Sequence, residues 1–211
     1  MTLTYRKAIN SALLHAFGRQ LQVPGLEARR ALTGHGELSM EEARFLGELV
    51  RESDPSRPII EIGTLFGWST KIICLFKQPQ QTLLTVDNYS WNPLGLSAED
   101  HFQITHEILA PLVKDENVIQ VSSEKGNFYA NYDGQPPALF FCDADHSYAA
   151  TLEDLQWSRS AGASIICGDD YSPDAFPGVV KAVSEVGGAA SVVDELFRLV
   201  DATQEQKENS R

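Results

Sequence analysis

From residue 58 onward, short β-rich runs alternate with segments that have helical spacing of their apolar residues. The β-rich runs cover residues 58–62, 82–86, 118–121, 138–142 and 163–167, and the helical segments cover 70–76, 98–112, 149–160 and 177–185. Parallel strands must be joined by long crossovers, which are usually helices. The alternation therefore predicts an α/β fold, a mostly parallel sheet with helices on both of its faces.

The two ends of the chain differ from this pattern. Ser191–Val200 contains two short β-like pieces with no room for a helix between them, which predicts an antiparallel edge hairpin and brings the sheet to seven strands. Residues 1–50 predict a helical extension, with one helix over Tyr5–Gln22 and another that begins after the N-cap Ser39. Residues 201–211 are polar and predict a frayed tail. Without a long linker or a repeat, residues 1–211 are expected to form a single domain.

Charge and hydropathy exclude several classes of partner. The net charge of −12 argues against nucleic acid, whose phosphates select basic surfaces, and against an anionic membrane. No apolar run is long enough to cross a bilayer, and the first residues do not form a signal peptide. We therefore expect a cytoplasmic protein without a nucleic-acid or membrane partner, and a homodimer is one option for its assembly.

The first strand ends in a glycine-containing loop, at the edge of the sheet where α/β proteins bind ligands. Gly63 and Gly67 permit sharp turns, but Leu65 replaces the glycine that a dinucleotide fingerprint requires, so the loop does not predict a pyrophosphate site. The second strand ends at Asp87, where a carboxylate is placed to accept hydrogen bonds from ribose hydroxyls. The alternative is that Asp87 belongs only to a turn.

Acidic residues follow two later strands. Asp143, Asp145 and His146 follow the fourth strand, and Asp169 and Asp170 follow the fifth. Neighbouring strands lie about 4.8 Å apart, so these carboxylates are expected to converge and to repel one another unless a cation lies between them. Oxygen ligands favour magnesium, with calcium and manganese as alternatives. The competing interpretation is that these acids cap helices or turns.

The two motifs together resemble class I methyltransferases, which use S-adenosylmethionine and have a Rossmann-like fold. The run from Glu61 to Ser69, followed by Asp87, is similar to their first two motifs, most closely in the cation-dependent O-methyltransferases of the catechol and caffeoyl-CoA types and in the macrocin and cephalosporin-pathway enzymes. The resemblance implies that Glu61 and Gly63 face the methionine end of the cofactor, that Ser69 caps the next helix, and that Asp87 holds the ribose. Further cofactor-binding residues that it implies are Ser39, Thr64, Ser123 and Asp143.

The same resemblance implies a metal site and a mechanism. Asp143, Asp169 and Asp170 match the metal ligands of these enzymes, although Asp170 stands where the plant and animal enzymes have asparagine. His146 stands where they often carry a lysine as general base. We expect O-methylation of a small-molecule hydroxyl, with Asp143 and His146 as catalytic residues. His146 has the alternative role of a hydrogen-bond partner to one of the aspartates.

Two other functions compete with this one. A magnesium-dependent phosphohydrolase would also use an Asp-x-Asp pair, but it would place that pair after its first strand rather than its fourth. A member of the fold that binds the cofactor without transferring a methyl group is the second alternative. Among the remaining histidines, His101 and His106 are expected on the surface, and the long loop that starts at Asn88 is expected to flank adenine or to cover the substrate.

Overall fold

The computed structural model describes residues 38–200, which form a seven-stranded sheet and its covering helices. The strands are β1 (Ile59–Ile62), β2 (Leu83–Asp87), β3 (Val118–Ser122), β4 (Leu139–Cys142), β5 (Ile165–Gly168), β6 (Ala189–Val193) and β7 (Leu196–Leu199). The helices are α3 (Met40–Glu52), α4 (Trp68–Phe76), α5 (Ala98–Asp115), α6 (Lys125–Asn131), α7 (Tyr148–Ser160) and α8 (Pro177–Glu185).

The sheet has the order β3-β2-β1-β4-β5-β7-β6. The first five strands in this order are parallel, and β7 pairs antiparallel with both β5 and β6. The predicted Rossmann-like sheet with an antiparallel edge hairpin is therefore confirmed. The order reverses between β1 and β4, so the loops after these two strands lie on either side of a crevice where ligands of α/β proteins bind.

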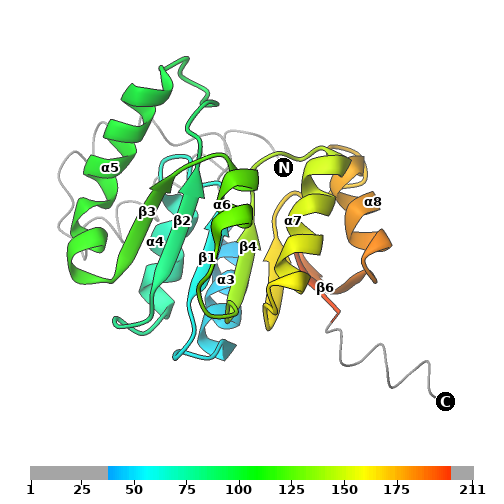
Figure 1. The fold of residues 1–211 in the computed structure, drawn as a ribbon. Coiled ribbons are helices and arrows are strands. Elements are labelled where there is room, and N and C mark those ends of the chain that lie inside the picture. Colours follow the sequence, from blue (N-terminus) through cyan, green and yellow to red (C-terminus); the bar gives the residue numbers. More distant parts are fainter. Residues whose placement is uncertain (1–37, 201–211) are drawn as a thin grey trace.

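Helices cover both faces of the sheet. Alternate residues of the central strands point to opposite faces, and apolar side chains on both faces pack against these helices. Ile59 belongs to the apolar core shared with α3, α4 and α5, whereas its neighbour Ile60 belongs to the core shared with α6, α7 and α8. Figure 1 shows α6 and α7 in front of the sheet and α3 and α4 behind it. All four residues of β1 and of β4 are buried, which explains why β4 is continuously apolar and why β1 departs from an apolar run only at Glu61.

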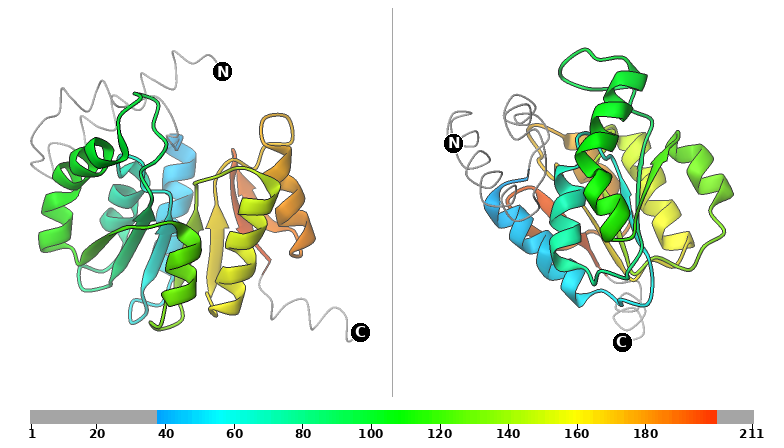
Figure 2. Two further views of the ribbon diagram at one scale, coloured as in Figure 1. Left: turned by 45° about the horizontal axis from the view of Figure 1, so that its top comes forward. Right: turned by 90° about the vertical axis from the view of Figure 1, so that its left-hand side faces the viewer.

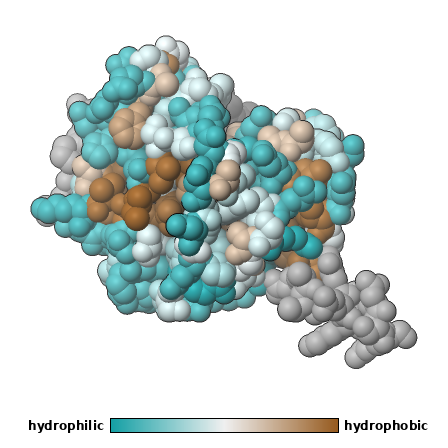
Figure 3. All heavy atoms as spheres, in the orientation of Figure 1, coloured by the Kyte–Doolittle hydropathy of each residue, from teal (hydrophilic) through white to brown (hydrophobic). Residues whose placement is uncertain are grey.

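One part of the sheet is less well covered. The seven-residue helix α6 is the only helix between β3 and β4, and Ile119 on β3 is 48% exposed. Figure 3 shows an apolar patch on this face, over the region of β2 and β3. Helix α6 was not predicted, because seven residues without a side-chain N-cap give too short a pattern to recognise.

Two predicted segments, the helix over Tyr5–Gln22 and the tail at 201–211, lie outside the described residues. Helix α5 contains Pro111 and runs three residues beyond its predicted end at residue 112, to Asp115. Among residues 38–200, no helix has the length and apolar character needed to cross a membrane. Figure 2 shows the loop between β2 and α5 projecting from the edge of the sheet at which the parallel strands end.

Candidate active site

A cavity of about 980 Å³ lies at the carboxyl ends of the parallel strands. Its volume is at the upper end of the range of about 300–1,000 Å³ that small-molecule and cofactor sites occupy. The loops after β1, β2, β4 and β5 all contribute to its wall. The predicted site residues that line it are Gly63, Thr64, Ser69, Asp87, Ser123, Asp143, His146, Asp169 and Asp170.

Asp87 organises the first two of these loops. One of its oxygens, Oδ2, accepts hydrogen bonds from the backbone N–H groups of Thr64 at 2.9 Å and Leu65 at 2.8 Å. The other, Oδ1, accepts from the N–H of Tyr89 at 2.7 Å. Its carboxylate thus joins the loop after β1 to the loop after β2, and it also lines the cavity where ribose hydroxyls were expected. A ribose would share this carboxylate with the backbone, because each oxygen has more than one lone pair.

Glu61 lies beneath the first loop rather than in the cavity. It is fully buried, and its two oxygens accept hydrogen bonds from Ser69 Oγ at 2.5 Å and Thr70 Oγ1 at 2.6 Å. Burial raises the pKa of Glu61, while the hydroxyl donors oppose that shift. The structure therefore does not place Glu61 facing a cofactor. The predicted cap role of Ser69 is wrong as well, because the N-cap of α4 is Gly67 and the Ser69 hydroxyl binds Glu61.

Gly63 brings the first loop against the end of β4. Its φ is 98°, and a Cβ at this position would lie 1.9 Å from the backbone oxygen of Asp143. A larger residue would have to push the two strand ends apart. The glycine therefore lets the predicted cofactor loop touch the first residue of the predicted metal site.

The second group of predicted residues also converges. Asp143, His146 and Asp170 each offer a ligand atom, and these atoms all lie within 4.8 Å of one another. His146 Nδ1 is 2.9 Å from Asp170 Oδ2, and the ring of Phe176 packs against the imidazole. Asp170 has a positive φ of 62°, a strained conformation of the kind found at ligand sites. The structure thus groups His146, rather than Asp169, with the other two carboxylates.

Asp169 lies beside this group with a buried oxygen, Oδ1, that has no hydrogen-bond partner in the described part of the chain. Burial and the nearby charge of Asp143 raise the pKa of Asp169 well above its usual value. Burial and the charge of Asp170 likewise raise the pKa of Asp143 to about 7. Unpaired buried carboxylates are costly, and a divalent cation would relieve both burial and repulsion. The residues present therefore fit a hard cation.

His146 responds to the same charges. Burial disfavours its imidazolium, but the hydrogen bond and charge of Asp170, together with the charge of Asp143, outweigh burial and raise the pKa of His146. Both roles predicted for His146 remain compatible with this geometry, since it contacts an aspartate and also lines the cavity.

One residue that lines the cavity, Glu42, was assigned no role from the sequence, and the predicted positions of Ser39 and of two histidines can be compared with the structure. Ser39 caps α3, as expected, but its hydroxyl binds Asp194 and it does not line the cavity; its neighbour Glu42 does. Glu42 was visible only as a first-turn acid, although its spacing from Ser39 forms a capping box. The prediction of a surface position is wrong for His101, which is fully buried, and right for His106, which is exposed.

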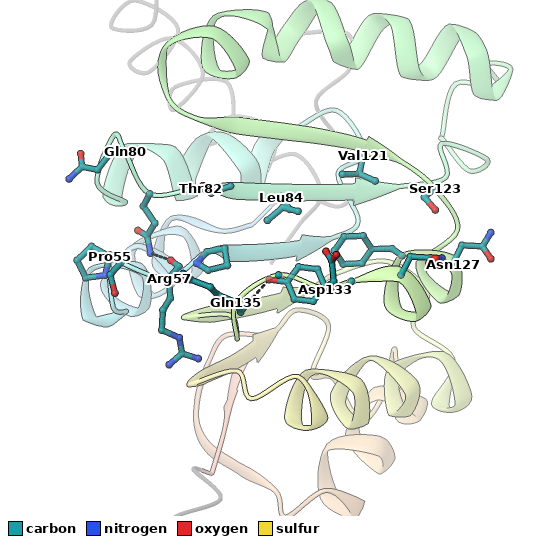
Figure 4. Close-up of a pocket in the computed structure, with 17 residues that line it drawn as sticks. Pro55, Arg57, Gln80, Thr82, Leu84, Val121, Ser123, Asn127, Asp133 and Gln135 are labelled. Carbon is teal, nitrogen blue, oxygen red and sulfur yellow. Dashed lines mark hydrogen bonds between the residues drawn. The ribbon is translucent and has the colours of Figure 1, made fainter.

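A second cavity, of about 710 Å³, lies on the less well covered face of β2 and β3. Figure 4 shows Leu84 and Val121 on its floor, with Gln80 toward one end and Asn127 toward the other. Ser123 lines both cavities. The convergent acids of the predicted metal site all belong to the first cavity, which is therefore the candidate active site.

A family model described as a methyltransferase domain matches residues 60–171, more than half of the 211-residue chain. The chain belongs to this family. The match runs from β1 to just beyond β5 and contains every predicted site residue except Ser39. The resemblance to class I methyltransferases is thereby confirmed for this methyltransferase domain. No curated protein matches the chain.

Solved structures share the fold at low identity. A candidate O-methyltransferase from Klebsiella pneumoniae has a TM-score of 0.63 at 20% identity, over 91% of this chain and 90% of that chain. An O-methyltransferase from Bacillus cereus, in complex with SAH, has a TM-score of 0.62 at 18% identity, over 89% of each chain. TomG from Streptomyces achromogenes, an O-methyltransferase of tomaymycin synthesis in complex with SAM, has a TM-score of 0.61 at 19% identity, over 91% of this chain and 89% of that chain.

Proposed function

We propose that this methyltransferase domain transfers the methyl group of S-adenosylmethionine to a hydroxyl oxygen of a small molecule, with the help of a divalent cation. One observation carries the proposal. The loops that Asp87 joins and the group formed by Asp143, His146 and Asp170 open into the same cavity. Two similar structures are O-methyltransferases with SAM or SAH bound, which supports the choice of cofactor and of acceptor atom.

The cofactor would lie along the loops after β1 and β2. Asp87 would accept hydrogen bonds from ribose hydroxyls while it keeps the backbone amides of Thr64 and Leu65 in place. Ser123, at the end of β3, would lie near the adenine. The methionine end would then point toward Gly63 and Asp143, where the acids of the cavity favour a cationic amino group.

The acceptor would approach from the side of Asp143, Asp169 and Asp170, the residues that would hold magnesium or a similar cation. When bound, the cofactor supplies an electrophilic methyl group and the cation supplies positive charge that favours an ionised hydroxyl. His146 is held by Asp170 and by the ring of Phe176, and its Nε2 accepts the proton that the hydroxyl loses. The cavity walls fix the distance and direction between the two reactants.

Two measurements test the proposal: calorimetry with S-adenosylmethionine, and turnover of a catechol probe, each with and without magnesium. Cofactor binding together with a magnesium effect on turnover of a catechol probe would support it. Absence of cofactor binding would overturn it, whereas binding without any effect of magnesium, calcium or manganese would remove only the metal part. Binding of both ligands with no methyl transfer to any tested hydroxyl would favour the alternative, a member of the family that binds the cofactor without catalysis.

A further inference from the structure

Two loops of the candidate active site each contain a residue other than glycine in the left-handed region. Leu65, after β1, has a φ of 47°, and Tyr89, after β2, has a φ of 58°. Such conformations cost on the order of 1–3 kcal/mol each and persist only where the surroundings hold them. The two loops therefore need support from other parts of the chain.

His101 supplies contacts to both strained residues. It lies in the first turns of α5, is fully buried, and faces the backbone oxygen of Leu65 with Nε2 at 3.0 Å and that of Tyr89 with Nδ1 at 3.2 Å. One turn further along α5, Thr105 donates its hydroxyl to the same Leu65 oxygen at 2.7 Å. The rings of Phe66 and Tyr89 pack against the imidazole and fix its orientation.

Asp87 holds the opposite side of the same two residues. The N–H groups of Leu65 and Tyr89 donate to Asp87, and their carbonyl oxygens face His101. In each strained residue, the backbone N–H is therefore held by the carboxylate of Asp87, and the backbone carbonyl oxygen contacts a ring nitrogen of His101. A carbonyl oxygen only accepts, and a neutral imidazole has one N–H, so neutral His101 donates to one of the two oxygens and lies against the other, whereas an imidazolium would donate to both.

We propose that His101 is a positioning residue that, opposite Asp87, holds the loops after β1 and β2 in the conformation that binds the cofactor. His101 does not line the cavity, so it acts through Leu65 and Tyr89 rather than through the ligand. This inference rests on the proposed function, because the loops are assigned to the cofactor there. Leu65 lines the cavity and Tyr89 does not, so the contact to Leu65 matters more for binding.

Three substitutions of His101 separate its two contacts. His101→Phe keeps a buried ring and removes both ring nitrogens. His101→Gln places an amide nitrogen near the position of Nε2, which faces Leu65, and His101→Asn places one near Nδ1, which faces Tyr89. His106→Phe is the matched control, because His106 lies on the same helix, is exposed and contacts Gln120 instead of the loops.

The measurement is the Kd for S-adenosylmethionine by calorimetry, beside the melting temperature of each variant and its Kd for magnesium without cofactor. Loss of the hydrogen bond that His101 donates, and of the contact of its other ring nitrogen, is expected to weaken cofactor binding by about tenfold in His101→Phe. The cofactor affinity of His101→Gln should be closer to that of the wild type than the affinity of His101→Asn is. If His101 only stabilised the fold, the two variants would have similar affinities. Magnesium binding should stay within about twofold of the wild type in every folded variant.

Equal cofactor affinity in His101→Phe and His106→Phe would overturn the inference and leave the proposed function standing. Failure of the wild-type protein to bind the cofactor would overturn both. If His101→Phe does not fold, the order of the Gln and Asn variants decides, together with Thr105→Val, which removes a second donor to Leu65. A Thr105→Val variant with wild-type affinity, combined with equal Gln and Asn values, would also overturn it.

Discussion

The acidic residues in and beneath the candidate active site have different environments, and each environment suggests a different role. Glu61 is buried and fully bonded to hydroxyl groups, so it stabilises the loop. Asp143 has a pKa of about 7 because of burial and the charge of Asp170, and Asp169 has a buried oxygen without a hydrogen-bond partner among residues 38–200. Asp143 and Asp169 would therefore gain from a cation, as Glu61 would not, which assigns these two to the metal side of the cavity.

The first prediction at this scale concerns pH. The pKa of Asp143 in the folded protein lies at about 7, above its ordinary value of 3.8, so the carboxyl holds a proton below that pH. A cation binds the ionised form, and the proton must leave. Magnesium affinity should therefore rise between pH 6 and pH 8, by roughly tenfold for one displaced proton.

Calorimetry in two buffers with different ionisation enthalpies would count the protons released at pH 6.5. The raised pKa of Asp169 adds to the release, so Asp169→Asn should release fewer protons than the wild type. Magnesium binding that releases no proton and is constant with pH would contradict the assignment of both residues to the metal.

The second prediction separates the two halves of the site. Asp169→Ala should lower turnover with a catechol probe by on the order of 10–100-fold, because metal affinity or position is lost. Its Kd for S-adenosylmethionine should change by no more than a few-fold, since Asp87 and the loop after β1 are unaltered. An equal loss of turnover and of cofactor affinity would show that Asp169 belongs to the cofactor site.

Residue types and strand ends were enough to predict which acids meet, but not their exact partners. Asp143 and Asp170 converge as the sequence suggested, but His146 rather than Asp169 is the third member of the group. The burial of Glu61 and of His101 depends on where the next helix packs, and the sequence of the loop contains no signal of that packing. Positions along a strand can be predicted from local pattern, whereas contacts between elements follow from tertiary structure.

At the scale of elements, the N-terminus of α3 is joined to the turn of the β6–β7 hairpin. Ser39 Oγ donates to Asp194 at 2.7 Å, and the N–H of Glu195 donates to Glu42 at 2.9 Å. Glu42 also accepts from the N–H of Ser39, which completes the capping box. The hairpin therefore closes one wall of the cavity through contacts to the capped start of α3, of which the sequence predicted only the N-cap Ser39.

The third prediction tests whether Ser39 is structural or touches the cofactor. Ser39→Ala removes the cap and the contact to Asp194, so it should lower the free energy of unfolding by about 1 kcal/mol in urea titrations. Cofactor affinity should remain within about twofold of the wild type, because Ser39 does not line the cavity. Ser39→Thr, which retains a capping hydroxyl, is the control. A tenfold loss of affinity at unchanged stability would instead support the predicted role of Ser39 in cofactor binding.

Over the whole molecule, alternation of strand and helix was sufficient to predict the sheet, because parallel pairing permits few topologies. The coverage of each face was less predictable. The short α6 leaves Ile119 half exposed, and nothing in the strand pattern indicates how far a neighbouring helix will reach. A homodimer stays a prediction, which sedimentation equilibrium would test.

The cavity, like the whole chain, has more acidic than basic side chains. The acids that line the cavity are Glu42, Asp87, Glu124, Asp143, Asp145, Asp169, Asp170 and Glu195, against the basic side chains of Lys71, Lys125 and His146. Lys125 is already paired with Asp154 at 2.6 Å. A divalent cation would offset the inner carboxylates and leave the exposed Glu124 and Asp145 at the rim. The field at the entrance therefore disfavours anionic acceptors such as coenzyme A esters.

The fourth prediction follows from this field. At low ionic strength, 3,4-dihydroxybenzoate should have a KM roughly tenfold higher than 3,4-dihydroxyphenylethylamine, because the rim repels a carboxylate and attracts an ammonium group. Added salt should reduce the difference, since the rim charges are exposed and screened. The double variant Glu124→Gln and Asp145→Asn should reduce it as well, while its cofactor affinity stays near the wild-type value. Equal KM values for the two acceptors, unaffected by salt, would show that the rim does not select substrates by charge and that shape alone decides.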